Sequence, residues 1–369
     1  MTKLKKTILT CVAVVVALIV LAAAAFCILY AGRFKTIATI EQITDYTDGL
    51  NLYCMDIAYD YSIEDIIQYG ITDDQSSIDA MLKEALPLLP VHIEAPNFGC
   101  SAFTLNGENA VMMGRNYDFR NDTSAMLVHC TPKDGYESVA FAALDNIGAN
   151  VADASFTSKM ACLTAPFVCL DGMNEKGVSI AVLTLDCEPT RQNTGKPKIS
   201  TTMAIRLVLD KAASTEEAVE LLSQYDMFAS SGRDYHFYIT DASGDGRIIE
   251  YDCESKGREL VATPVRTVTN FLIMYKEKVT QVGKNGIYGH GLERYEAMEE
   301  VFDAAEQKNA ETAWAALMAA AQEPNGDVTS NTQWSIVFNN TDLTADFILH
   351  RKWDDRVSYN LKTNTVVMP

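Results

Sequence analysis

The amino-acid sequence predicts an α+β fold in which helices cover β-sheets, preceded by one membrane-spanning helix. Two observations support this prediction. After residue 99, strand-like runs and pairs of helices follow one another in the order strands, helices, strands, helices, strands. Near the amino terminus, residues 8–30 form an uncharged, mostly apolar stretch, which can cross a hydrocarbon core of about 30 Å at about 1.5 Å per residue.

The charges around the apolar stretch predict its orientation. Three lysines lie among the first six residues, and positive charge ahead of a span favours a cytoplasmic amino end and an extracellular body. Secretory signal cores are shorter, at about 7–15 residues. The alternative is a long signal sequence cleaved near the alanines at 22–25. We therefore expect a single-pass protein of the cell membrane, or a protein secreted after processing.

An acidic lead-in separates the span from the rest of the chain. Apolar residues recur at three- and four-residue spacing in 36–44 and 76–89, which predicts a largely helical segment. We assign residues 1–32 to a cytoplasmic tip and anchor, and residues 33–99 to an exported leader. No repeat or low-complexity linker divides residues 100–369, which are expected to form one domain.

Within that domain, turn and capping signals place the elements in order. The sequences NGEN at 106–109 and NEKG at 174–177 predict tight turns between paired strands. Helices are expected at 201–212 and 214–225, the second opening with Ser214 as N-cap and Glu217 three residues later. The remaining predicted elements are strands at 100–107, 110–119, 125–132, 138–144 and 167–185, which include the paired strands, and strands at 236–252 and 267–274. Helices are expected at 293–307 and 310–322, and strands at 332–340, 344–350 and 356–361.

Composition excludes several classes of function. The net charge of −19 and the pI near 4.6 argue against a nucleic-acid partner, because phosphate-binding surfaces need clustered Lys and Arg. The nine cysteines include no C-x-x-C pair and the five histidines no H-E-x-x-H motif, so no metal site is predicted. Seven cysteines follow the span, so at least one exported thiol is free; disulfide pairing and oligomeric state stay open.

The pair Gly99–Cys100 is the strongest chemical candidate. A thiol reacts as thiolate, and its ordinary pKa of about 8.5 requires a nearby cation or base at neutral pH. If Cys100 became an amino terminus, its own α-amino group, with a pKa near 7.7–8.0, would supply that base. Gly99 has no side chain to block the attack of the thiol on its carbonyl. The alternative is an ordinary buried thiol in a strand.

Further segments follow Cys100 in a recognisable order. They are CSAF at 100–103, GRNYDF at 114–119, DGMNEKGVSIAVL at 171–183, YHFYITDASGDGRIIEY at 235–251, TVTNFL at 267–272, GHGLERYEAM at 289–298 and TQWSIVF at 332–338. Together they resemble the choloylglycine hydrolase and linear amide C–N hydrolase family of N-terminal-nucleophile hydrolases. This family includes bile salt hydrolases, penicillin V acylases and isopenicillin N acyltransferase. The resemblance spans residues 99–338 and implies a four-layer αββα sandwich.

The resemblance also implies roles for the residues around the thiol. Cys100 would be the nucleophile and, once freed from Gly99, would supply the base. Arg115 would hold a positive charge near the sulfur, where the alternative is an ordinary salt bridge. Asp118 would accept a hydrogen bond from the α-amino group, where the alternative is a turn-capping carboxylate.

The remaining implied roles concern the oxyanion and its support. Asn270 would donate its side-chain amide to the developing oxyanion, and Arg294 would support Cys100 and Asp118. Bile salt hydrolases carry Asn at the second oxyanion position, where this chain has Thr184. The family uses a backbone N–H there, which Thr also provides.

By this resemblance, the chain is expected to hydrolyse non-peptide linear amides through a thioester, after autocatalytic cleavage between Gly99 and Cys100. The partner is then a small-molecule acyl amide, and no metal or organic cofactor is implied. The long leader resembles the acyltransferase branch, in which the leader stays bound to the catalytic chain. An acyltransferase of the isopenicillin N type and a non-catalytic surface binding protein are the alternatives.

Overall fold

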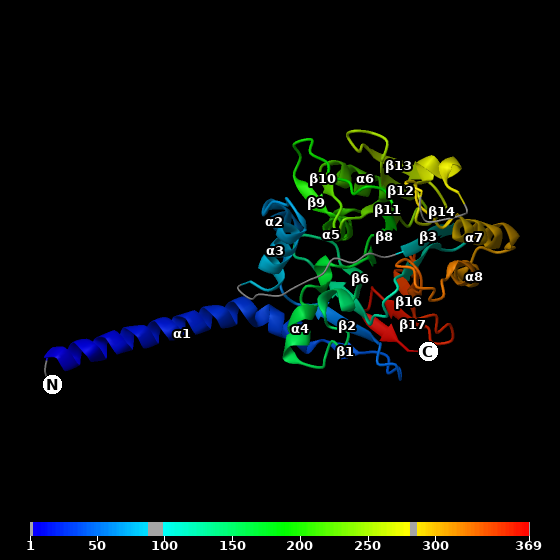
Figure 1. Ribbon diagram of the computed structural model, residues 1–369. Helices are drawn as coiled ribbons and strands as arrows, with labels where there is room; N and C mark the ends of the chain where they lie inside the picture. The colour runs from blue at the N-terminus through cyan, green and yellow to red at the C-terminus, as the bar shows by residue number, and fades with distance from the viewer. Residues whose placement is uncertain (1–2, 88–98, 281–285, 369) are drawn as a thin grey trace.

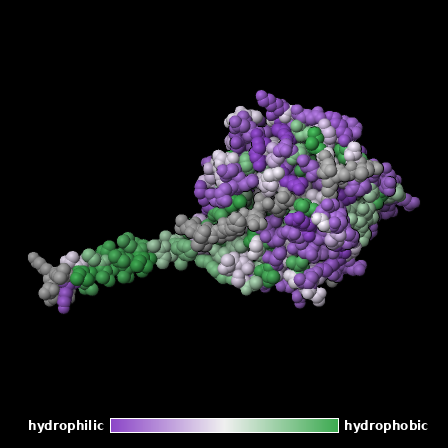
Figure 2. Space-filling model, in the orientation of Figure 1, coloured by the Kyte–Doolittle hydropathy of each residue, from purple (hydrophilic) through white to green (hydrophobic). Residues whose placement is uncertain are grey.

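A long amino-terminal helix projects from a globular body in the computed structural model, which describes residues 3–87, 99–280 and 286–368 (Figure 1). Helix α1 (Lys3–Ala38) is long and apolar enough between residues 5 and 38 to span a membrane, and its apolar window is not buried against the body. Figure 2 shows this helix as a hydrophobic rod beside a largely hydrophilic body. A signal sequence near the amino terminus has the same properties.

The last turns of α1 are attached to the body. Arg33 is buried and donates from Nε to the Ala85 carbonyl at 2.7 Å and from Nη2 to the Glu84 carbonyl. These carbonyls end helix α3 (Asp74–Ala85), whose last carbonyls have no partner within the helix. Helix α1 therefore continues past residue 32, where the anchor was expected to end, and its final turns pack on the leader.

Two large sheets form the body. The nine-stranded sheet has the order β1-β2-β5-β6-β7-β8-β11-β12-β13, and the seven-stranded sheet has the order β14-β3-β4-β15-β16-β17-β18. The strands of the first are β1 (Glu41–Gln42), β2 (Leu52–Ile57), β5 (Ala125–Cys130), β6 (Ser138–Ala143), β7 (Asp171–Asn174), β8 (Ser179–Leu185), β11 (Asp234–Thr240), β12 (Gly246–Tyr251) and β13 (Leu260–Pro264). Those of the second are β3 (Gly99–Asn106), β4 (Val111–Asp118), β14 (Thr267–Val268), β15 (Thr332–Asn339), β16 (Thr344–Leu349), β17 (Val357–Asn360) and β18 (Thr365–Val367). A small parallel pair joins β9 (Lys198–Ser200) and β10 (Asp226–Phe228).

Helices cover the outer faces of both sheets. Helices α5 (Thr201–Lys211) and α6 (Thr215–Ser223) pack on the nine-stranded sheet, and α7 (Leu292–Ala304) and α8 (Ala310–Ala320) pack on the seven-stranded sheet. Between the sheets, the rings of Phe141 and Phe347 stack with centroids 4.9 Å apart. The order helix, sheet, sheet, helix confirms the predicted αββα sandwich. The other helices are α2 (Ile63–Gln68), α4 (Phe156–Cys162) and the 3-10 turns Asp145–Ile147, Ala165–Phe167 and Ile273–Lys278.

Most local predictions in this body are confirmed. The turns at 106–109 and 174–177 join β3 to β4 and β7 to β8, and the Ser214 side chain accepts a hydrogen bond from the Glu217 N–H at 3.1 Å. The strand expected at 267–274 is wrong after residue 268. There the chain leaves the sheet and forms the 3-10 turn Ile273–Lys278.

The three- and four-residue spacing of apolar residues predicted a largely helical leader, and this prediction is wrong for the described part of the leader. Residues 36–44 end α1 and form β1, and β2 pairs in parallel with β5 from Leu52↔Ala125 to Ile57↔Cys130. The predicted helix at 76–89 is confirmed as α3 as far as Ala85, but Leu86 and Pro87 lie beyond its end, and residues 88 and 89 lie outside the described part. Apolar spacing could not reveal β2, because a short buried strand is completed by hydrogen bonds to a distant partner. The leader is therefore an integral part of the larger sheet.

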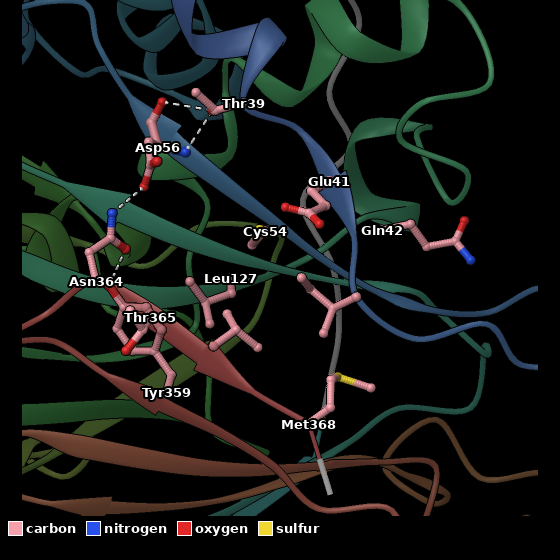
Figure 3. Close-up of a pocket in the computed structure, with 12 residues that line it drawn as sticks. Thr39, Glu41, Gln42, Cys54, Asp56, Leu127, Tyr359, Asn364, Thr365 and Met368 are labelled. Carbon is pink, nitrogen blue, oxygen red and sulfur yellow. Dashed lines mark hydrogen bonds between the residues drawn. The ribbon is translucent and has the colours of Figure 1, made fainter.

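Polar contacts reinforce this junction between leader and body. Asp56 on β2 contacts His129 on β5, with Oδ1 2.9 Å from Nδ1, and His129 Nε2 lies 2.8 Å from Glu137 Oε1. Asn364 donates to Asp56 Oδ1 at 3.0 Å, and Thr39 bonds to the Asp56 backbone (Figure 3). Thr39, Asp56 and Asn364 border a cavity of about 430 Å³ between β1, β2 and the carboxyl-terminal hairpin.

The His129 contacts predict a pH-dependent stability. Burial alone would lower the pKa of His129, but its hydrogen bonds to Asp56 and Glu137 outweigh burial and raise the pKa. A histidine with a raised folded-state pKa stabilises the fold fully below its unfolded pKa of about 6.5, and this stability is lost as the pH rises through the raised value. Both carboxylates are partly exposed, so the gain is about 1 kcal/mol or less.

We expect the thermal midpoint of the wild type to fall between pH 6 and pH 8 by more than that of His129→Gln. Differential scanning calorimetry at both pH values measures this difference. His350→Gln is the matched control, because burial lowers the pKa of His350 instead. Equal pH slopes for the wild type and His129→Gln would refute the prediction.

Candidate active site

The hairpin of β3 and β4 places the candidate nucleophile Cys100 beside the cationic side chain of Arg115. Cys100 lies opposite Tyr117 in the ladder, and Arg115 is two residues from Tyr117 along β4. Side chains two residues apart on a strand, and those directly opposite across an antiparallel pair, point to the same face. Cys100 and Arg115 therefore share the face that meets the other sheet, where both are fully buried.

A hydrogen-bond donor holds the sulfur of Cys100. Arg115 Nη2 lies 3.2 Å from Sγ. The backbone N–H of Asp118 acts to lower the pKa of the thiol. Burial raises the pKa of the Cys100 thiol to about 12, even though the charge of Arg115 acts in the opposite direction. With the Gly99–Cys100 peptide intact, the thiol is therefore protonated at neutral pH and needs a base to react.

Asp171 fixes the guanidinium of Arg115, and the sequence reasoning did not select it. Its Oδ2 lies 2.8 Å from Arg115 Nη1 and accepts a hydrogen bond from Trp334 Nε1 at 3.1 Å. Arg115 Nη2 also donates to the Val182 carbonyl at 3.1 Å. Burial raises the pKa of Asp171 to about 6, against the opposing effect of Arg115. The contact with Asp171 Oδ2 holds Arg115 in place against the sulfur.

Asn270 follows the short strand β14 and is oriented by its neighbours. Its Oδ1 accepts from the Cys100 backbone N–H at 2.9 Å and from Arg294 Nη2 at 2.8 Å, while its Nδ2 donates to the Thr184 carbonyl at 2.9 Å. Because the first two groups can only donate, the amide oxygen must face them. The Nδ2 group has a second hydrogen, which none of these contacts uses.

Arg294 joins the remaining candidates. Its Nη1 donates to the Cys100 carbonyl at 2.8 Å and lies 3.4 Å from Asp118 Oδ2. Gly291 makes this possible, because a Cβ there would lie 2.4 Å from Arg294 Nη2, and its φ of +90° also favours glycine. The Asp118 carboxylate accepts from the Thr332 hydroxyl at 2.6 Å and from Gln322 Nε2 at 2.7 Å.

The structure thus brings all six predicted site residues into one buried cluster: Cys100, Arg115, Asp118, Thr184, Asn270 and Arg294. The Cys100 N–H, as an amide, donates to Asn270 and not to Asp118 as expected for the free amine. Sequence reasoning missed Asp171, Gln322 and Thr332, although Asp171 begins the quoted segment at 171–183 and Thr332 begins the late strand. In the described residues, no group of His, Cys, Asp and Glu could hold a metal ion.

Comparisons with known proteins identify the family of the chain and its fold. Residues 105–354 match the sequence profile of the family described as acyl-coenzyme A:6-aminopenicillanic acid acyl-transferase. Penicillin V acylase from Agrobacterium tumefaciens superposes with a TM-score of 0.51 at 20% identity, covering 71% of this chain and 86% of that one. A conjugated bile acid hydrolase mutant from Clostridium perfringens gives 0.50 at 14% identity, covering 73% and 96%. These two show the fold alone, and no curated protein matches the chain.

Proposed function

The chain belongs to the acyl-coenzyme A:6-aminopenicillanic acid acyl-transferase family of N-terminal-nucleophile amide hydrolases and acyltransferases, and on that premise we propose that it hydrolyses linear amide C–N bonds with Cys100 as an amino-terminal nucleophile. The observation that carries this proposal is the contact of Cys100 Sγ with Arg115 Nη2, 3.2 Å long, inside a buried cluster. An arginine beside a buried thiol is not decisive alone, because Arg206 Nη1 also lies 3.4 Å from Cys130 Sγ. At Cys100 the same cluster adds the Asn270 amide, oriented by the Cys100 N–H and by Arg294.

Self-cleavage prepares the nucleophile. The sulfur attacks the Gly99 carbonyl carbon, an S–C bond forms, the C–N bond breaks, and the thiol proton passes to the nitrogen of Cys100. Water then hydrolyses the thioester, releasing the Gly99 carboxylate and restoring the thiol. The Cys100 nitrogen becomes a free amine, whose pKa near 7.7–8.0 suits a general base at neutral pH.

The same residues then act on an external amide. The α-amine of Cys100 takes the thiol proton and gives it to the leaving amine, while Asn270 Nδ2 and the Thr184 N–H stabilise the oxyanion. One such donor typically contributes about 3–4 kcal/mol to lowering the barrier. Arg115 favours the thiolate, and Arg294 orients Asp118 near the freed amine.

Three further properties complete the proposal. The leader remains bound after cleavage, a conclusion that the pairing of β2 with β5 supports. Helix α1 anchors the protein in the cell membrane with the catalytic part outside, as its apolar length and the preceding lysines support. The second candidate reaction is acyl transfer to an amine, which the description of the family favours and which uses the same residues.

An assay of product partitioning tests the proposed function. Full-length protein in detergent is incubated with a panel of straight-chain and arylacetyl amides of one chromogenic amine, with and without hydroxylamine. We expect release of the amine in both conditions. The free acid dominates without hydroxylamine for a hydrolase, whereas turnover that requires an acceptor indicates an acyltransferase. If protein that begins at Cys100 cleaves no amide in the panel, the proposed function is wrong.

A further inference from the structure

Gly99 packs against Thr329, which forms a wall of the site and leaves no room for a side chain on residue 99. A Cβ on residue 99 would lie 2.5 Å from the carbonyl oxygen of Thr329, 2.6 Å from its Cβ and 2.9 Å from its Cα. Two of these three atoms belong to the backbone, so a rotamer change cannot relieve the overlap. Gly99 begins strand β3, whose extended backbone any residue can adopt, so the space beside it is the reason for glycine here.

The wall is held by the site itself. The Thr329 carbonyl accepts from Gln322 Nε2 at 2.7 Å, and the same nitrogen donates to Asp118. The Thr329 hydroxyl lies 3.1 Å from His290 Nε2, and His290 Nδ1 lies 2.8 Å from Asp186 Oδ2. Thr329 is 4% exposed. These hydrogen bonds hold both its backbone and its side chain in place.

The backbone of His290 ties this support to the oxyanion side of the site. The His290 N–H donates to the Asn270 carbonyl at 2.9 Å. Asp186 follows Thr184 by two residues and also pairs with Arg233 at 3.3 Å. The wall and the proposed oxyanion donors are thus parts of one hydrogen-bonded framework, so the wall stays in place when the peptide at Gly99 is cut.

The proposed self-cleavage makes Gly99 the first acyl group on the sulfur. Its Cα is the α-carbon of that thioester, directly beside Thr329. An external amide must place its own carbonyl carbon on the same sulfur, near the same donors. Its α-carbon then takes the position of the Gly99 Cα, and one substituent takes the position of the missing side chain.

We infer, on the basis of the proposed function, that this enzyme accepts acyl groups with an unsubstituted CH₂ next to the carbonyl and rejects a branch on the L side of that carbon. Thr329 is the specificity-determining residue, and His290 and Gln322 position it. Straight-chain and arylacetyl groups meet this requirement. An acyl group derived from an L-amino acid other than glycine does not.

The test uses processed full-length protein and three amides of one chromogenic amine. They are the straight-chain amide that is cleaved fastest and the two enantiomers of its 2-methyl derivative. We expect kcat/KM for the enantiomer whose methyl group matches an L side chain to be about 10- to 100-fold lower than for the straight chain. For the opposite enantiomer, kcat/KM should fall by a smaller factor. Cleavage of all three amides at equal rates would overturn the inference and leave the proposed function standing, whereas no cleavage of any amide would overturn both.

Two sets of variants locate the effect at the wall. Thr329→Gly removes one of the three atoms that residue 99 would meet, the Cβ, and also removes the hydroxyl that holds the other two, the backbone carbonyl oxygen and Cα. It should therefore narrow in part the ratio of kcat/KM between straight and branched substrates. Thr329→Ser keeps the Cβ and the hydroxyl and should not change this ratio. Gly99→Ala should slow self-cleavage at least tenfold, as followed by gel electrophoresis. Self-cleavage of Gly99→Ala at the wild-type rate, or equal ratios for Thr329→Gly and Thr329→Ser, would contradict the role of Thr329.

Discussion

Replacing Cys100 with alanine should leave the Gly99–Cys100 region uncut and abolish amide hydrolysis. The sulfur is both the group that attacks Gly99 and the group that carries the substrate acyl chain, so no other atom in the cluster can replace it. Loss of a nucleophile lowers turnover by a factor on the order of 10⁴ or more in enzymes of this kind. Intact-mass spectrometry and amine release measure the two effects. Cys100→Ser should retain slow cleavage, because a hydroxyl is a weaker nucleophile.

A matched control is a buried thiol outside the cluster. Cys162 in α4 is fully buried, and burial raises its pKa to about 12, as it does for Cys100. Cys162→Ala should be cut and active like the wild type. A Cys100→Ala protein that still splits after Gly99, or still releases amine, would refute the assignment. Folded Cys100→Ala and wild-type proteins that are both uncut and inactive would favour a surface binding protein.

Replacing Asp171 with asparagine should have the largest effect on stability. Asp171 and Arg115 have fully buried side chains 2.8 Å apart, and the change leaves the Arg115 charge buried without its counter-charge. Breaking a buried ion pair by removing one partner costs about 3–5 kcal/mol of folding free energy. Urea unfolding measures this loss. Self-cleavage should also slow strongly, because Arg115 is no longer held against Sγ.

A double variant separates folding from chemistry. Arg115→Met combined with Asp171→Leu removes both charges, and well-packed apolar pairs often replace buried ion pairs without loss of stability. We expect the double variant to be more stable than Asp171→Asn and yet unprocessed. Asp60→Asn, at an exposed aspartate, is the control for the loss of one negative charge. Wild-type processing in the double variant would show that Arg115 has no role in the chemistry.

The sequence predicted the helices and hairpins whose signals are local. The capping Ser214, the turns at 106–109 and 174–177 and the paired helices all depend on neighbouring residues, and the structure confirms them. The strand β2 was missed because its partner β5 is distant in the sequence, although LYCMDI has the aromatic and apolar content of a short strand.

Only the part of the candidate site that lies in motifs of recognisable order could be predicted from the sequence. The positions of Cys100, Arg115, Asp118, Asn270 and Arg294 came from such motifs, and these residues lie together in the structure. The partners that hold these residues in place, above all Asp171 and Gln322, could not be predicted from motifs, because a buried pair between distant segments leaves no periodic pattern in the sequence. The sequence suggested that residue 99 is glycine so that no side chain blocks the attack of the thiol on its carbonyl. The structure adds a second reason, because Thr329 leaves no room for a Cβ on residue 99.

The amino-terminal residue of fully active protein tests the central claim most directly. The active preparation is titrated with a thiol-directed acyl probe, and the labelled chain is analysed by tandem mass spectrometry. We predict a chain that begins at Cys100 with a free α-amine, accompanied by the retained leader that ends at Gly99. An intact Gly99–Cys100 peptide in fully active, labelled material would contradict the account.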